Sequence, residues 1–294
     1  MNCLVCGNKN EEEFSNYLSL DYLRQCQKCG FVFMAEVRQV KDYYQHKISR
    51  EFDSTKQNSR FRNCQDRLKI FKKFINPNMD ILDVGCNEGS FLKVAQDFGY
   101  KILGLEPNDR LLNYAKSCNL PVIQGTIEDF KTEKNFDVIT LFNVLEHLKE
   151  PTATIRKIDS LLSPGGYLVL ELPNIDSYLA KKLKENWEMI TIEHLFYFSP
   201  KTIKIFLADK GFLIKKISIR QFDEWNLGIK DSLARLGLHS FKTKKQFQLS
   251  SPGPKITQNS KQRRTYLKPI RFLLSILVKI FRRGDYILIV AKKV

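Results

Sequence analysis

A short apolar strand that runs directly into a glycine turn constrains this chain most. It covers residues 80–89, which read Asp-Ile-Leu-Asp-Val-Gly-Cys-Asn-Glu-Gly. The apolar run is typical of a buried parallel strand, and Gly85 and Gly89 stand where a turn into a helix needs a positive φ and a close approach to a ligand. A dinucleotide turn has a middle glycine where this chain has Asn87. Because Glu88 would also repel a diphosphate, the pattern favours a ligand with a positive centre.

A second strand is predicted over residues 101–106, which read Lys-Ile-Leu-Gly-Leu-Glu. Its last residue, Glu106, lies about twenty residues after the glycine turn, where a carboxylate can accept hydrogen bonds from both hydroxyls of a ribose. A second acidic residue, Asp83, precedes the turn itself. The sequence therefore indicates a nucleoside ligand with a positively charged part.

Further strands and helices alternate along the chain at regular intervals. Three more apolar segments read as strands: the start of 121–129, then 136–142 and 167–172. A helix is predicted from about residue 151 to 162, with a proline at its permitted first position and a glycine pair after its end. This alternation predicts right-handed crossovers and one doubly wound α/β sheet of the Rossmann-like type, with the ligand at the carboxyl ends of its strands.

The order and spacing of these segments resemble the class I methyltransferases that use S-adenosylmethionine, over roughly residues 60–222. The resemblance implies a seven-stranded sheet whose last strand, within 284–294, runs antiparallel beside 212–219. It also implies these cofactor-binding residues: Asp83, Gly85, Cys86, Asn87, Gly89, Glu106, Thr126, Ile127, Glu128 and Asn143. In the family the two glycines line the methionine part and the 126–128 segment holds the adenine. An alternative remains open, in which Thr126 caps a helix and the acidic groups of 83 and 88 are a strand-end carboxylate and a first-turn acid.

The segment 143–148, Asn-Val-Leu-Glu-His-Leu, follows the fourth strand and looks like the family's motif beside the methyl group. Methyl transfer to oxygen needs a base, and histidine titrates near neutral pH. We therefore expect His147 and His194 as catalytic candidates, with Glu146 beside them; the alternative for His147 is that it braces the loop. In the ubiquinone-pathway O-methyltransferases, which this segment resembles, acidic residues and a histidine are associated with a divalent metal. Asn143 at the first acidic position weakens that case here.

The first forty residues contain two Cys-x-x-Cys pairs about twenty residues apart, a spacing typical of a tetrahedral zinc site. The four cysteines are Cys3, Cys6, Cys26 and Cys29. A glycine follows each pair, which incidental cysteines would not show twice. We therefore predict a zinc-ribbon-like domain over residues 1–40, with a closed structural site that does not activate water. The remaining cysteines, Cys64, Cys86 and Cys118, are interpreted as small apolar fillers in a reducing cytosol.

The acceptor is predicted from two resemblances. Sugar methyltransferases that act on nucleotide-linked sugars have a similar N-terminal four-cysteine domain, and residues 193–199 and 210–212 resemble relatives that modify sugars, quinones and other small acceptors. We expect a small or lipid-linked acceptor, with a sugar hydroxyl in polysaccharide or glycolipid assembly preferred. An RNA methyltransferase ranks second, because the chain lacks a basic platform interleaved with aromatic residues and the cysteine domain carries three consecutive acids at 11–13. A non-catalytic, membrane-associated adaptor that keeps the cofactor fold is the third alternative.

The net charge of +16 is concentrated near the end of the chain. Residues 224–294 carry 16 Lys or Arg and three acidic residues, whereas the predicted core, 45–223, is nearly neutral. Within this region 224–283 is interpreted as an insertion before the final strand, 284–294. It ends in a basic amphipathic helix, 266–283, which is too short and too charged to span a bilayer. Whether that helix lies on an anionic membrane or packs on protein stays open. No signal peptide is recognised, so we expect a cytoplasmic protein that can associate with the inner face of the membrane.

Overall fold

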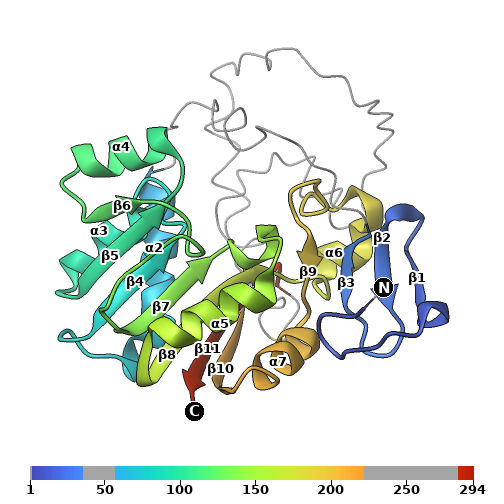
Figure 1. The fold of residues 1–294 in the computed structure, drawn as a ribbon. Helices are drawn as coiled ribbons and strands as arrows, with labels where there is room; N and C mark the ends of the chain where they lie inside the picture. The colour runs from blue at the N-terminus through green and yellow to red at the C-terminus, as the bar shows by residue number, and fades with distance from the viewer. Residues whose placement is uncertain (1, 36–56, 222–283) are drawn as a thin grey trace, which may run out of the picture.

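The structure, a computed structural model, describes residues 2–35, 57–221 and 284–294 (Figure 1). The predicted insertion 224–283, its helix 266–283 and the first part of the predicted core lie outside the described residues. Within the described ranges no helix has both the length and the apolar character that crossing a membrane requires.

The larger sheet contains seven strands in the order β10-β11-β8-β7-β4-β5-β6. The strands are β4 (Asp80–Val84), β5 (Lys101–Glu106), β6 (Val122–Gln124), β7 (Phe136–Phe142), β8 (Leu162–Pro173), β10 (Phe212–Arg220) and β11 (Tyr286–Lys293). The pairs among β4 to β8 are parallel, and β11 is antiparallel to both of its neighbours, β8 and β10. This confirms the predicted doubly wound, seven-stranded sheet with an antiparallel last strand.

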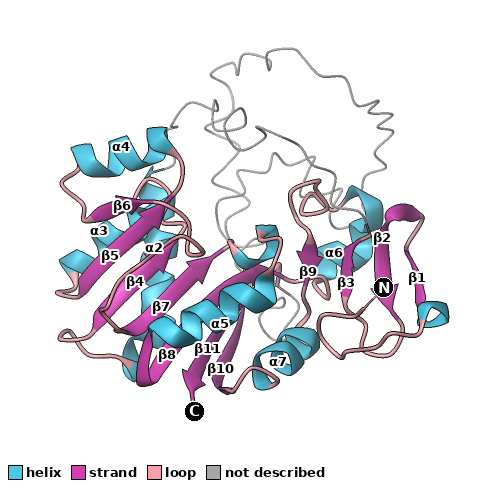
Figure 2. Ribbon diagram, viewed as in Figure 1, coloured by secondary structure: helices cyan, strands magenta, loops and turns pink. Residues whose placement is uncertain are grey.

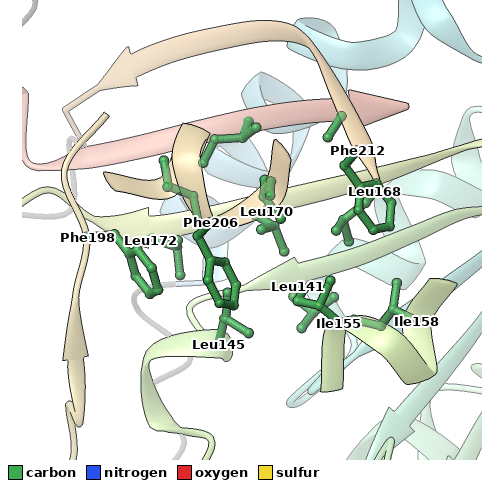
Figure 3. Packing of buried hydrophobic residues seen from close by; sticks show 14 of the residues in the cluster. Leu141, Leu145, Ile155, Ile158, Leu168, Leu170, Leu172, Phe198, Phe206 and Phe212 are labelled. Carbon is green, nitrogen blue, oxygen red and sulfur yellow. The ribbon is translucent and has the colours of Figure 1, made fainter. Parts of the chain in front are cut away.

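Helices cover both faces of the sheet because its central strands are apolar on both sides. Even-numbered Leu168, Leu170 and Leu172 of β8 pack in one hydrophobic cluster with α5 (Pro151–Leu161) and α7 (Pro200–Ala208), as Figure 3 shows. Odd-numbered Val169 lies in the other cluster, with α2 (Gln57–Phe71) and α3 (Ser90–Asp97). The same cluster includes Ala115 of α4 (Asp109–Ser117). The period of two along each strand thus divides the core into two layers.

Helix α3 begins at Ser90, with Gly89 in a left-handed conformation as its N-cap. One element boundary differs from the sequence expectation. The residues predicted as a turn after α5 lie inside β8 as a bulge, because Phe136 pairs with Leu162 whereas Val138 already pairs with Tyr167. The glycine pair lies in this bulge. The sequence indicated where the regular backbone is interrupted, but not that the interruption lies within a strand.

The cysteine-containing N-terminus forms a second, four-stranded antiparallel sheet in the order β1-β2-β3-β9 (Figure 2). Its strands are β1 (Phe14–Tyr17), β2 (Leu20–Cys26), β3 (Val32–Met34) and β9 (Phe196–Tyr197), preceded by the short 3-10 helix η1 (Glu11–Glu13). The fourth strand, β9, comes from the segment between β8 and α7, which also contains α6 (Tyr178–Leu183) and η5 (Lys184–Asn186). The N-terminal region and the larger domain therefore share one sheet, an arrangement that the sequence did not indicate.

Candidate active site and cysteine cluster

The glycine turn after β4 is shaped by its neighbours. The backbone N–H groups of Gly85 and Cys86 both donate to the carbonyl oxygen of Leu105, at 2.9 and 3.0 Å, which fixes the turn against β5. Gly85 has a φ of +69°, and a Cβ atom added there would lie 2.7 Å from Cγ2 of Val144. Only glycine therefore fits this position without strain.

A cavity of about 380 Å³ opens at the carboxyl ends of β4 and β7. Its wall includes five of the predicted cofactor residues, namely Asp83, Gly85, Cys86, Asn87 and Asn143. The remaining lining residues are Arg60, Asn63, Cys64, Arg67, Glu88, Ser90, Phe91, Phe142 and Tyr286. The four from α2 were missed, although their spacing of three, four and seven residues places them on one helix face and could have indicated a shared role. No sequence pattern pointed to Tyr286.

Asp83 is a buried carboxyl on the cavity wall. Its Oδ1 accepts a hydrogen bond from the hydroxyl of Thr140 at 2.6 Å. Burial raises the pKa of Asp83 to about 7, although the bond from Thr140 and the charge of Arg67 act in the opposite direction. The cavity thus holds a carboxyl group whose charge changes near neutral pH.

Arg67 brings positive charge to the same wall. Its guanidinium lies over the ring of Phe142, 4.7 Å from the centroid, and donates from Nε and Nη2 to Glu171 at 2.8 and 2.6 Å. Burial alone would lower the pKa of Arg67, but the charge of Glu171 raises it. Arg220 donates to the other oxygen of Glu171. One carboxylate is therefore shared by two guanidinium groups, and the guanidinium of Arg67 lies on the cavity wall.

The other predicted cofactor residues lie off the cavity wall. Both oxygens of Glu106 accept backbone N–H groups at 2.9 Å, from residues 87 and 108, and burial raises its pKa. A Cβ at Gly89 would lie 2.3 Å from Leu120, so glycine is needed there for helix packing. The Thr126 hydroxyl caps a turn by accepting from the N–H of residue 129 at 3.4 Å, close to the alternative interpretation. Ile127 is buried in the core, and Glu128 accepts from the hydroxyl of residue 154 at 2.9 Å. Their cofactor roles stay predictions.

The structure brings the three predicted catalytic residues together. One ligand atom each of Glu146, His147 and His194 lies within 4.8 Å of the others. The first two belong to the 3-10 helix η4 (Leu145–His147) after β7, and the third precedes β9. Nδ1 of His147 lies 3.0 Å from the carbonyl oxygen of Glu193, and Nδ1 of His194 lies 2.8 Å from that of Met189. Because a carbonyl only accepts, each ring carries its proton on Nδ1, and the Nε2 atom of the neutral ring has the lone pair.

Three oxygen atoms at this turn are buried without a hydrogen-bond partner among the described residues: Oε1 and Oε2 of Glu146 and Oδ1 of Asn143. Burial raises the pKa of Glu146 to about 8. An unsatisfied buried acceptor costs about 1–3 kcal/mol, so these atoms indicate a site for a proton donor or a cation. One carboxylate and two imidazoles oriented by carbonyls form a donor set that fits a divalent cation, and they equally fit a proton relay.

Tyr286 connects the cavity with this cluster. It lines the cavity from the start of β11, and its hydroxyl donates to Sδ of Met189 at 3.8 Å. The carbonyl of Met189 in turn accepts from His194. Tyr286 therefore links the cavity wall to Met189, whose carbonyl oxygen orients the candidate base His194.

The four N-terminal cysteines form a compact cluster. All four Sγ atoms lie within 4.8 Å of one another, with Cys3 to Cys29 at 3.6 Å and Cys6 to Cys26 at 3.7 Å. A tetrahedral zinc with Zn–S bonds of about 2.3 Å requires S–S separations of about 3.8 Å, so the donor set fits the ion. Burial raises the pKa of Cys3 to about 11, a shift that a bound cation would reverse.

A family model described as a methyltransferase domain matches residues 55–216. Curated relatives include ubiquinone biosynthesis O-methyltransferases of Vibrio parahaemolyticus, 34% identical over 109 residues, and Proteus mirabilis, 27% identical over 181 residues. These alignments cover 34% and 58% of this chain and 46% and 68% of the relatives, so the chain spans less than half of the former.

Solved methyltransferases share the fold. A SAM-dependent methyltransferase of Thermotoga maritima is 16% identical with a TM-score of 0.53, covering 84% of this chain and 97% of that one. The plantazolicin methyltransferase BpumL, solved with SAH, is 16% identical with a TM-score of 0.52, covering 86% and 91%. With the family match over more than half of its length, the chain belongs to the methyltransferase-domain family and has the class I, S-adenosylmethionine-dependent fold.

Proposed function

We propose that this protein is an S-adenosylmethionine-dependent methyltransferase that methylates a hydroxyl group of a small or lipid-linked acceptor. One observation carries the proposal: the cavity bounded by the glycine turn is linked through Tyr286 and Met189 to His194, which lies together with His147 and the buried carboxyl of Glu146. The cavity suits the cofactor, and the cluster suits the acceptor side.

The charges of the cavity wall support a zwitterionic ligand. The methionine part of the cofactor has a carboxylate, a cationic amine and a sulfonium centre. Arg67 offers a positive charge to the carboxylate, whereas Glu88, and Asp83 in its ionised form, offer negative charge to the cationic groups. The family pattern implies that Glu106, the last residue of β5, would accept hydrogen bonds from the ribose hydroxyls.

The bound cofactor supplies an electrophilic methyl group in an in-line displacement, in which the acceptor oxygen forms a bond to carbon as the carbon–sulfur bond breaks. The acceptor proton must then leave. Nε2 of His147 or His194 would accept it, and the neighbouring Glu146 would stabilise the resulting imidazolium when it is ionised. A divalent cation held by the same three side chains would instead lower the pKa of the acceptor hydroxyl.

Two observations bear on the acceptor. The relatives are named for ubiquinone biosynthesis, which favours a small hydroxyl-bearing intermediate of such a pathway. The four-cysteine pattern favours the sugar hydroxyl of polysaccharide or glycolipid assembly, the acceptor preferred from the sequence. Both classes offer an oxygen nucleophile of the kind the histidine cluster would deprotonate. Assays with a quinone-precursor phenol and with nucleotide sugars would separate them.

We also propose that the cysteine cluster holds one structural zinc ion. The S–S separations and the glycine with positive φ after each cysteine pair support it. Metal analysis of the purified full-length chain should give one zinc per chain, and Cys26→Ser should abolish it. A folded protein that takes up no zinc would contradict the assignment.

The experiment that tests the proposed function is calorimetric titration of S-adenosylmethionine and S-adenosylhomocysteine into the full-length protein. We expect binding in the micromolar range, and its loss in Asp83→Ala and Glu106→Ala. Glu133→Ala, an exposed carboxylate before β7, is the matched control and should bind like the wild type. A folded wild type that binds neither compound would refute the proposal and favour the non-catalytic adaptor.

A further inference from the structure

Leu195 joins the cysteine-containing sheet to the candidate catalytic cluster. The backbone N–H of Met34 in β3 donates to the carbonyl oxygen of Leu195 at 2.8 Å. The N–H of Leu195 donates to the carbonyl oxygen of Glu146, also at 2.8 Å. The residue next to His194 is therefore fixed between the small sheet on one side and the turn that carries Glu146 and His147 on the other.

Strand pairing and aromatic packing extend this contact. Val32 and Phe33 of β3 pair with the two residues of β9. The ring of Phe31 lies 6.1 Å from that of Phe196 and 5.0 Å from that of Phe198. Figure 3 shows Phe198 in the same group of side chains as Leu145, the residue directly before Glu146. The small sheet therefore supports both chain segments of the catalytic cluster.

The cysteines lie at the base of this support. Cys26 is the last residue of β2, and its N–H donates to the carbonyl oxygen of Phe31 at 2.9 Å. Cys3, Cys26 and Cys29 belong to the same buried cluster as Phe31 and Leu145. On the opposite face of the small sheet, the fully buried Trp187 begins the segment whose carbonyl at residue 189 orients His194. An ordered cysteine cluster would therefore stabilise the position of His194 by two routes, through β3 and through the segment that begins at Trp187.

The cofactor cavity is built differently. Its lining residues come from α2, the end of β4, the following turn, the start of α3, the end of β7 and the start of β11, and none comes from residues 2–35. Apart from the contact of Tyr286 with Met189, the cavity wall thus depends on the larger domain and not on the small sheet.

We propose that zinc in the cysteine cluster acts on catalysis by positioning the histidine cluster, with Met34 and Leu195 as positioning residues, while the cofactor cavity forms without it. This rests on the proposed function for the roles of the two half-sites. Loss of the metal frees β3, which releases Leu195 and with it the backbone that places His194 and Glu146. The pocket around Gly85 keeps its shape because its contacts lie in the larger domain.

The test uses the full-length protein and two measurements that need no acceptor. Zinc is removed with a zinc-selective chelator in excess magnesium and then restored. Calorimetry measures binding of S-adenosylhomocysteine, and NMR follows the imidazole Nδ1–H signals, with His147→Gln and His194→Gln used for assignment among the four histidines. We expect the affinity to change less than about two-fold, whereas both Nδ1–H signals disappear without zinc and return with it.

A pair of variants separates metal removal from strand positioning. Phe33→Ala removes a buried ring of β3 that pairs with β9, and should disturb both Nδ1–H signals while zinc stays bound. Leu18→Ala removes an exposed apolar side chain from the turn between β1 and β2 of the same sheet, and should leave the signals in place.

Unchanged Nδ1–H signals in the folded, zinc-free protein would overturn the proposal, as would loss of cofactor binding together with those signals. A zinc-loaded wild type that binds no S-adenosylhomocysteine would refute the proposed function instead, and the imidazole comparison would still decide whether the small sheet positions the histidines.

Discussion

Replacing Gly85 with alanine tests whether the glycine turn is required for its backbone conformation, for its close contact, or for both. At a φ of +69° an alanine is strained, which costs about 1–2 kcal/mol. The added Cβ would also lie 2.7 Å from Cγ2 of Val144, and overpacking of this kind costs about 1–3 kcal/mol. We therefore expect Gly85→Ala to lower the free energy of unfolding by about 2–5 kcal/mol.

Gly99 provides the matched control. It has a φ of +83° and nothing within 4 Å of an added Cβ, so Gly99→Ala carries the conformational strain without the clash. Its expected loss is about 1–2 kcal/mol, and the difference between the two variants isolates the contact with Val144. In a Val144→Ala background, Gly85→Ala should lower the free energy of unfolding by no more than Gly99→Ala does.

Urea denaturation followed by circular dichroism measures these differences, and calorimetry with S-adenosylhomocysteine reports the cavity. Gly85→Ala should weaken binding, because the residue lines the cavity, whereas Gly99→Ala should not. Equal destabilisation by the two variants would refute the argument that Val144 closes this turn.

Three further outcomes follow from the site. His147→Gln and His194→Gln should each lower the turnover number by about 10²–10⁴-fold with cofactor affinity unchanged; full turnover in both would exclude a histidine base. In the folded protein the pKa of Asp83 is raised to about 7, so its contribution to the free energy of unfolding is full below about pH 4 and is lost as the pH rises to 7. Asp83→Asn should remove that pH dependence from denaturation curves. Glu171→Ala removes the carboxylate that two buried guanidinium groups share and should cost about 3–5 kcal/mol, whereas Asp97→Ala, at an exposed pair, should change stability by less than about 1 kcal/mol. A cost of similar size in those two variants would contradict the burial argument.

The sequence predicted the large sheet well because its strands have unambiguous signals. The apolar run that ends in Gly85, and the run that ends in Glu106, each fix a parallel strand and the residue after it. His147 and His194 were both named as candidates from the sequence, and the structure places them together with Glu146, although α6 and η5 separate His194 from the end of β8; their catalytic role stays a prediction. The contribution of α2 to the cavity wall was missed, because polar residues such as Arg60 and Arg67 fit the solvent-facing side of a helix equally well.

The shared small sheet could not have been predicted from local pattern. β9 is two residues long, and its partner β3 lies more than 160 residues earlier in the chain, so no periodicity links them. A similar limit applies to Tyr286, whose place on the cavity wall depends on β11 entering the sheet next to β8. Contacts of this kind depend on tertiary packing, so no pattern within a short stretch of sequence predicts them.

The internal position of β11 has a consequence for synthesis. Until residues 286–293 leave the ribosome, β8 and β10 cannot be bridged, and each has an open edge with unpaired backbone groups. Pairing across more than 100 residues is also slow, because loop closure precedes any gain from the new contacts. The nascent chain is therefore exposed to edge-to-edge association and to chaperone capture until its last strand arrives.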